Sequence, residues 1–313
     1  MVDRTVERRP RLSIGMPVYN AERFLEQAVE SILSQSFEDF ELVIADNAST
    51  DRTEEICNKF AAKDNRVNCF RNRQNYGLIY NFNLVFRLSL GEYFKWAASD
   101  DVCAPDYLAR AVEVLDSDPS VVLAWGKTVG IDENGNRVRM RHEVSDLNSP
   151  ESVYSPDPTV RFRRLMQNIF WANGPLYGVL RSSALASTKS LHPRHMSGDQ
   201  ILITELSLKG RMYEIPEELF FSRVHAQKTS HRQRTLRDRA TLVDHKPPGR
   251  GPIGWWRMFR GYPQRIVMYI GIISRAPLSA REKLKCSFEV LRAIGSWTAL
   301  RIGQVSRGES PWR

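Results

Sequence analysis

The sequence predicts an α/β fold, with a mainly parallel sheet that is covered by helices on both faces. Over residues 1–125, short apolar segments typical of buried strands alternate with amphipathic segments typical of helices. Strands that are separated by helices in this way are joined by crossover connections and run parallel. The composition agrees, because 42% hydrophobic and 26% charged residues in a chain of 313 are ordinary for a globular protein with a sizeable core.

The first strand and helix are the clearest of these segments. Leu12–Val18 is short and apolar, as expected for a buried strand. In Ala21–Gln35, apolar residues recur every three or four positions and glutamates occupy the opposite face, which predicts an amphipathic helix. Asn20 directly precedes this helix and is its expected N-cap.

The same alternation continues along the chain. Further strands are expected at Leu42–Asp46, Val67–Phe70, Tyr93–Ala98, Val121–Trp125 and Leu176–Leu180. Further helices are expected around Ile56 and Phe60 and at Ile79–Leu90, Ala104–Leu115, Val160–Phe170 and 198–208. Arg211–Arg223 is expected to form strands that Pro216 interrupts. The polar segment Arg139–Thr159 is predicted to be a loop.

The charge is distributed unevenly along the chain. Residues 1–150 hold 18 Lys and Arg against 24 Asp and Glu, whereas residues 223–313 hold 19 against 5. We therefore predict a main domain at 1–240 and a basic, amphipathic helical extension at 241–313. The four cysteines have no paired spacing, which argues against a disulfide framework or a zinc site.

The extension mixes aromatic and basic residues. Trp255, Trp256, Met258 and Phe259 lie next to arginines, a pattern that suits a membrane interface. The apolar run Ile266–Ile273 is too short to cross a bilayer, which takes ~20 residues. Packing on the main domain or on a second copy of the chain is the alternative.

Polar residues follow three of the predicted strands, at Pro17–Asn20, Asp46–Asn47 and Ser99–Asp101. Parallel strands end at one edge of a sheet, and ligands of open α/β sheets bind there. The adjacent carboxylates of Asp100 and Asp101 repel each other unless a cation binds, and Mg²⁺ and Mn²⁺ prefer such oxygen ligands. For an isolated pair, a solvated turn or a helix cap is the competing interpretation.

Seven segments in this order and spacing resemble the family 2 glycosyltransferases, which are inverting enzymes of the Rossmann-like GT-A fold. They are Ser13–Asn20 (SIGMPVYN), Phe40–Asp51 (FELVIADNASTD), Asn75–Gly77 (NYG), Gly91–Leu108 (GEYFKWAASDDVCAPDYL), Gly178–Leu185 (GVLRSSAL), Ser197–Gln200 (SGDQ) and Arg223–Ser230 (RVHAQKTS). The resemblance covers about residues 11–232. The main domain is therefore expected to be a GT-A glycosyltransferase domain.

The resemblance implies a nucleotide pocket at the strand ends. Pro17 and Tyr19 would line this pocket, with the Tyr19 ring against the base. Asp46 would accept a hydrogen bond from the base, and Asp100 would contact the ribose or the metal. Asn47 stands where many relatives have an aspartate, which is a mild departure from the family pattern.

The resemblance also implies a metal and a general base. Asp101 would ligate a Mg²⁺ or Mn²⁺ ion that bridges the diphosphate, and His225 would help to hold the metal or the diphosphate. Asp199 would take the proton of the attacking hydroxyl, and capping of its helix is the alternative role. Because Ala98 replaces an acidic residue that many relatives have, we expect fewer protein ligands and more water around the metal.

The predicted function is transfer of a sugar, of the hexosyltransferase type, from a nucleoside-diphosphate donor to a hydroxyl of a glycan or a lipid-linked acceptor. A role in cell-envelope polysaccharide or glycolipid synthesis is expected. The start of the chain shows no secretory signal, so we expect a cytoplasmic enzyme, peripheral at the inner face of the membrane. No nucleic-acid partner is expected. The alternatives are a nucleotide-sugar-binding protein without turnover and a polyanion-binding protein that uses the basic tail.

Overall fold

The computed structural model describes residues 9–139, 152–167, 173–189, 191, 198–225 and 255–306, without the side chains of residues 173, 255–264 and 294–306. Most of the predicted loop Arg139–Thr159 and the predicted boundary near residue 240 lie outside these ranges. The same holds for the side chains of Trp255, Trp256, Met258 and Phe259.

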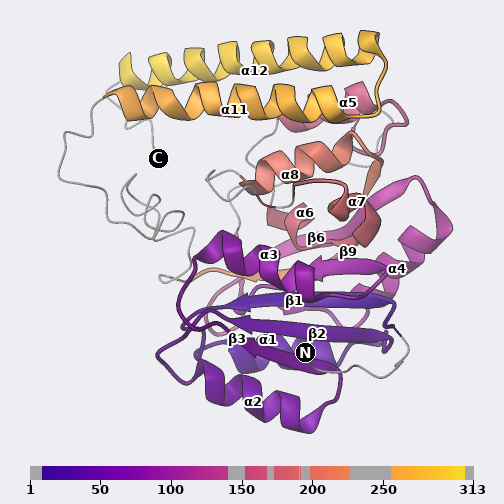
Figure 1. Ribbon diagram of the computed structural model, residues 1–313, viewed down its shortest axis with the longest axis vertical. Helices are drawn as coiled ribbons and strands as arrows, with labels where there is room; N and C mark the ends of the chain where they lie inside the picture. Colours follow the sequence, from indigo (N-terminus) through magenta and orange to yellow (C-terminus); the bar gives the residue numbers. More distant parts are fainter. Residues whose placement is uncertain are drawn as a thin grey trace.

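One sheet forms the centre of the molecule (Figure 1). In the described part of the chain it has nine strands, in the order β3-β2-β1-β4-β8-β6-β9-β5, with β7 paired to β6. The first four strands of this order are parallel, as the sequence predicts, and they are β3 (Val67–Arg71), β2 (Phe40–Asp46), β1 (Leu12–Val18) and β4 (Tyr93–Trp96). Their strand–helix connections place all four carboxyl ends at one edge of the sheet.

The other half of the sheet is mixed. Its strands are β8 (Val179–Arg181), β6 (Val121–Ile131), β9 (Arg211–Arg223), β5 (Val102–Cys103) and β7 (Arg137–Val138). β8 is antiparallel to both β4 and β6, whereas β6 and β9 are parallel. β9 is one strand across Pro216, where the structure differs from the predicted interruption. Its register with β6 shifts there, because proline cannot donate to the ladder and a bulge absorbs it.

Helices cover both faces of the sheet, as predicted (Figure 1). One face packs against α1 (Leu25–Leu33), α2 (Thr53–Lys63) and α4 (Tyr107–Ser117). The other face packs against α3 (Leu78–Leu88), α6 (Asn173–Leu176), α7 (Ser182–Ala186) and α8 (Gly198–Ser207). The parallel strands are buried on both faces, which explains why they read as continuous apolar runs.

The expected N-cap role of Asn20 is wrong. Helix α1 begins at Leu25, and its N-terminal flanking residue is Phe24. Asn20 instead has a positive φ of 49°, which asparagine tolerates better than most residues, and its Oδ1 accepts the backbone N–H of Thr50 at 2.8 Å. Its side chain therefore joins the loops that follow β1 and β2.

A third apolar cluster joins the C-terminal helices to the body of the protein. It combines side chains of α5 (Pro158–Gln167) and α8 with those of α11 (Trp255–Arg275) and α12 (Ala280–Ser306). Figure 1 shows α11 and α12 lying side by side as the outermost layer, over α5 and α8. In the described part of the chain, no helix combines the length and apolar character needed to cross a bilayer.

Candidate functional site

The loops after β1 and β2 are tied to each other. The two strands are parallel and in register, with Val18 opposite Asp46, and the N–H of Asn47 donates to the carbonyl of Val18 at 2.9 Å. Pro17 is half-buried in β1, whereas Tyr19, the second residue after it, is 49% exposed. An exposed aromatic ring at a strand end offers a flat surface on which a base can stack.

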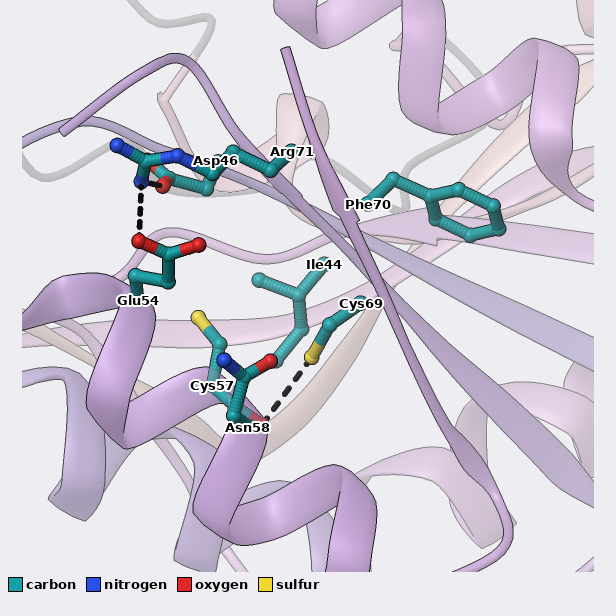
Figure 2. A pocket seen from close by; sticks show the side chains of 8 residues that line it. All are labelled: Ile44, Asp46, Glu54, Cys57, Asn58, Cys69, Phe70 and Arg71. Atoms are coloured by element: carbon teal, nitrogen blue, oxygen red, sulfur yellow. Dashed lines mark hydrogen bonds and ion pairs between the residues drawn. The ribbon is translucent and has the colours of Figure 1, made fainter.

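Asp46 already has protein partners. Its Oδ1 accepts the backbone N–H of Ser49 at 2.9 Å, and its Oδ2 pairs with the guanidinium of Arg71. Figure 2 shows Arg71 reaching from β3 across Asp46 to Glu54, whose carboxylate is 3.3 Å away. The pocket below them, which also includes Cys57, has a volume of about 40 Å³, enough for a water molecule and too small for a nucleoside.

The carboxylate pair after β4 meets the end of β9. His225 Nε2 lies 2.8 Å from Asp100 Oδ2, and Asp101 Oδ1 accepts the backbone N–H of Arg223 at 2.8 Å. Asp101 is only 4% exposed, and Asp100 is the more accessible of the two. The fold therefore brings the adjacent Asp100 and Asp101 together with His225, which lies more than 120 residues further along the sequence.

A buried arginine, Arg223, holds the backbone around Asp100 and Asp101 in place. The guanidinium of Arg223 donates to three carbonyls, those of Asp100 at 2.9 Å, Asp132 at 3.0 Å and Glu133 at 3.1 Å. It also lies over the ring of Phe24, 4.6 Å from the centroid. Because a planar guanidinium makes several hydrogen bonds of fixed direction, Arg223 fixes the backbone on which the two aspartates are carried.

Tyr177 links the carboxylate pair to Asp199. It lies between α6 and β8, and burial raises the pKa of its phenol well above the usual value. The negative charges of Asp101, Asp100 and Asp199 add to that rise. The pKa of this one phenol therefore responds to carboxylates from both segments, residues 100–101 and residue 199.

Asp199 lies in the first turn of α8, and its Oδ1 accepts the N–H of Gln200 at 2.8 Å. Burial raises the pKa of Asp199, and the positive charge of Arg265 on α11 opposes that rise. A half-buried carboxylate of raised pKa is a typical general base, because it holds a proton more readily than an exposed aspartate does.

The described residues do not form a complete metal site. Among them, no group of three or more His, Cys, Asp or Glu side chains is arranged to hold a metal ion. Asp100, Asp101 and His225 supply oxygen and nitrogen donors at one place, which fits a hard cation that takes its remaining ligands from a diphosphate and water.

The family comparison covers more than half of the chain. The model described as "Glycosyl transferase family 2" matches residues 13–184. This range includes β1 to β4, the Asp100–Asp101 pair and Tyr177. Asp199, His225 and the C-terminal helices lie beyond it.

Curated relatives match between a third and just over two fifths of the chain. An uncharacterized glycosyltransferase of Haemophilus influenzae is 35% identical over 131 residues, which are 42% of this chain and 52% of that protein. The putative glycosyltransferase EpsE of Bacillus subtilis is 36% identical over 34% of this chain and 39% of its own length. Chondroitin synthase of Escherichia coli is 33% identical over 43% of this chain and 19% of its own length. The chain spans about half or less of the length of these relatives.

Solved structures resemble nearly the whole chain. TarS 1–349 of S. aureus, in complex with UDP-GlcNAc, has a TM-score of 0.62 and 20% identity, covering 91% of this chain and 73% of that one. The mannosyltransferase PcManGT of Pyrobaculum calidifontis, in complex with GDP-Man and Mn²⁺, has a TM-score of 0.53 and 17% identity, covering 98% and 83%. At these identities the likeness shows the fold, which is GT-A.

Three residues at the site escaped the sequence analysis. Tyr177 directly precedes the motif that begins at Gly178. Arg223 is the first residue of the motif that contains His225, but no role was predicted for it. Arg265 had no such signal, because it lies 35 residues beyond Ser230, where the last motif ends.

Proposed function

Because the chain belongs to glycosyl transferase family 2, we propose that it moves a hexose from a nucleoside-diphosphate donor to a hydroxyl group with inversion at the anomeric carbon. One observation carries this proposal. At the carboxyl end of β4, Asp100 lies 2.8 Å from His225 and Asp101 accepts the N–H of Arg223, so that this strand end carries the groups that a donor diphosphate and its metal would need.

The donor nucleotide would lie at the ends of β1, β2 and β4. Tyr19 is exposed and free to stack on the base. Pro17, two residues earlier in β1, lies at the same edge of the sheet. Asp46 would accept a hydrogen bond from the base, with Arg71 as its ion-pair partner. Asp100 would contact the ribose or the metal, and its bond to His225 would fix its orientation.

A divalent cation, Mg²⁺ or Mn²⁺, would be held by Asp101 with His225 nearby, and the diphosphate and water would complete its ligands. When bound, the cation supplies positive charge that stabilises the departing diphosphate. Arg223 would act as a positioning residue, because it fixes the backbone that carries Asp100 and Asp101.

Asp199 would be the general base. An acceptor hydroxyl has a high pKa, so a carboxylate must take its proton while the new C–O bond forms and the bond from the anomeric carbon to the diphosphate breaks. Direct displacement from the face opposite the leaving group inverts the anomeric carbon. The raised pKa of Asp199 suits this role, and α8 presents its carboxylate from the first turn.

The acceptor would be a growing glycan or a lipid-linked sugar in cell-envelope polysaccharide or glycolipid synthesis. We propose that the enzyme works at the inner face of the cell membrane, which its basic C-terminal helices would contact. A homodimer through these helices is the alternative use of the same surface.

A donor screen tests the proposal. Release of nucleoside diphosphate is measured for a panel of nucleotide sugars, with and without Mn²⁺, for the wild type, Asp101→Ala and Asp199→Asn. We expect turnover that needs the metal, a loss with Asp101→Ala, and a loss of about 10²–10⁴-fold in kcat with Asp199→Asn. Glu205→Gln, which changes a buried acid on α8 that pairs with Arg275 at 3.7 Å, is the matched control and keeps kcat.

Donor affinity distinguishes an enzyme with Asp199 as its general base from a protein that binds nucleotide sugars without turnover. If Asp199 is the base, Asp199→Asn binds the donor as tightly as the wild type in isothermal titration calorimetry, since the base acts on the acceptor. Binding of a nucleotide sugar by the wild type without turnover of any donor–acceptor pair would instead support the binding protein without activity. Full kcat in the Asp199→Asn variant would remove Asp199 from the mechanism.

A further inference from the structure

The outer face of α12 is apolar. Leu284, Phe288 and Leu291 are 73%, 65% and 63% exposed. They recur at steps of four and three residues and therefore share one face of the helix. Single exposed apolar residues are ordinary on protein surfaces, whereas three large ones in one stripe indicate an interaction surface. We call these three residues the α12 stripe.

The buried residues of α12 fix the direction of the stripe. Cys286, Val290 and Ala293 are buried in the cluster shared with α5, and by their spacing they lie on the side of the helix opposite the α12 stripe. The stripe therefore points away from the body of the protein, from the outermost layer of Figure 1. On the neighbouring helix α11, Val267 and Ile270 are exposed as well.

Cations lie beside the stripe. Arg281, Lys285 and Arg292 are all exposed on α12. Helices α11 and α12 together, residues 255–306, contain nine Lys and Arg and two Glu. Glu289 is paired with Arg292 at 3.1 Å. By sequence, the nine cations and two glutamates give the two helices a net charge of +7.

We propose that the α12 stripe and its flanking cations bind an anionic membrane surface. Apolar side chains would enter the lipid interface while Arg281 and Lys285 approach the anionic headgroups. A second copy of the chain fits this surface less well, because it would bring two strongly basic helix pairs together. This inference rests on the proposed function, since it names the surface by which the enzyme would reach a lipid-linked acceptor.

Vesicle co-sedimentation of the full chain tests the inference. Vesicles of phosphatidylcholine are compared with vesicles that also contain phosphatidylglycerol, and we expect binding to the anionic ones that weakens with salt. Leu284→Ser and Phe288→Ser should each lower the partition coefficient by about tenfold. Lys285→Gln should lower it by about fivefold. Leu90→Ser replaces an exposed leucine outside these helices and should leave binding unchanged.

Three results would overturn the inference. The first is equal binding to neutral and anionic vesicles, and the second is unchanged binding by Leu284→Ser and Phe288→Ser. The third is a dimer in analytical ultracentrifugation without lipid that the same substitutions convert to a monomer, because the surface would then serve self-association.

Turnover is measured separately, without lipid, so that the two proposals fail independently. A chain that transfers sugar to a soluble acceptor and binds no vesicles contradicts only the membrane surface. A chain that binds anionic vesicles and turns over no donor contradicts only the proposed activity.

Discussion

Burial and charge act in opposite directions on Asp199. Burial raises its pKa, whereas backbone N–H groups of Gln200 and Asp199 and, to a smaller degree, the positive charge of Arg265 on α11 lower it. Tyr269 of the same helix also lies near Asp199, whose negative charge adds to the pKa rise that burial causes in the Tyr269 phenol. The candidate base is therefore tuned by a helix that lies beyond the family match, and its pH dependence should report on that helix.

Arg265→Gln should shift the pH profile of turnover. Without the cation, the pKa of Asp199 rises further, so the base is protonated at pH values where the wild type is active. The acid limb of kcat/KM should move to higher pH, with little change well above that limb. The matched control is Arg281→Gln on the exposed face of α12, which should keep the wild-type profile. A downward shift, or the same shift in both variants, would contradict the assignment.

Arg71→Met should destabilise the protein, because it leaves the carboxylate of Asp46 buried without its cation. We expect a loss of about 1–2 kcal/mol in the free energy of unfolding by urea denaturation, modest because the Arg71 side chain is open to solvent. Arg73→Met, an exposed arginine two residues away, should change stability by less than about 0.5 kcal/mol. Equal losses in the two variants would show that the pair with Asp46 contributes nothing.

At the site, the sequence predicts which functional residues follow the strands. It does not predict which side chains these residues contact. Asp100, Asp101 and Tyr19 lie in motifs at strand ends, so their common edge follows from the parallel order alone. That Arg71 pairs with Asp46, or that Arg223 supports Asp101, depends on side-chain directions in the packed structure. Periodicity carries no information of that kind.

At the scale of elements, two glycines show how closely the backbone segments pack. A Cβ on Gly91, which precedes β4, would lie 2.6 Å from the backbone nitrogen of Ser13 in β1. A Cβ on Gly271 in α11 would meet only the flexible end of Arg275, at 3.3 Å. The first contact cannot relax without moving a central strand, whereas the second can relax by a side-chain rotation.

Gly91→Ala and Gly271→Ala should therefore have opposite effects on stability. The first should lower the free energy of unfolding by about 1–3 kcal/mol, through overpacking against β1. The second should raise it by about 0.5–1 kcal/mol, because alanine favours a helix interior. Chemical denaturation of the two variants side by side measures both values. A Gly91→Ala variant as stable as the wild type would mean that β1 and β4 can separate without cost.

The parallel half of the sheet could be predicted element by element, because each strand there is a short apolar run followed by a helix. The prediction of β1 matches its observed bounds, Leu12–Val18. The short strands β5 and β7 were missed, since two residues carry no period. The continuity of β9 across Pro216 was also missed, because the bulge depends on pairing with β6, which is remote in sequence.

At the scale of the whole molecule, the third apolar cluster connects the C-terminal helices to α5 and α8, which come from the middle of the chain. Phe162 of α5 packs edge-on against Tyr269 of α11, with ring centroids 6.4 Å apart, and both are buried. Ile201, two residues after Asp199, belongs to the same cluster. The C-terminal helices thus support the helix that carries the candidate base, a link that the charge pattern of the sequence did not reveal.

Ile272→Ala and Ile270→Ala test this link with the same substitution on one helix. Ile272 is 3% exposed in the third cluster, whereas Ile270 is 42% exposed. We expect Ile272→Ala to cost about 2–5 kcal/mol of unfolding free energy and to lower kcat, because α8 loses part of its support. Ile270→Ala should change stability by no more than about 0.5 kcal/mol and leave kcat unchanged.

In calorimetry the wild type should unfold in one transition, because the cluster joins the C-terminal helices to the sheet. Two separate transitions, with only the smaller one shifted by Ile272→Ala, would mean that these helices fold independently and that Asp199 does not depend on them.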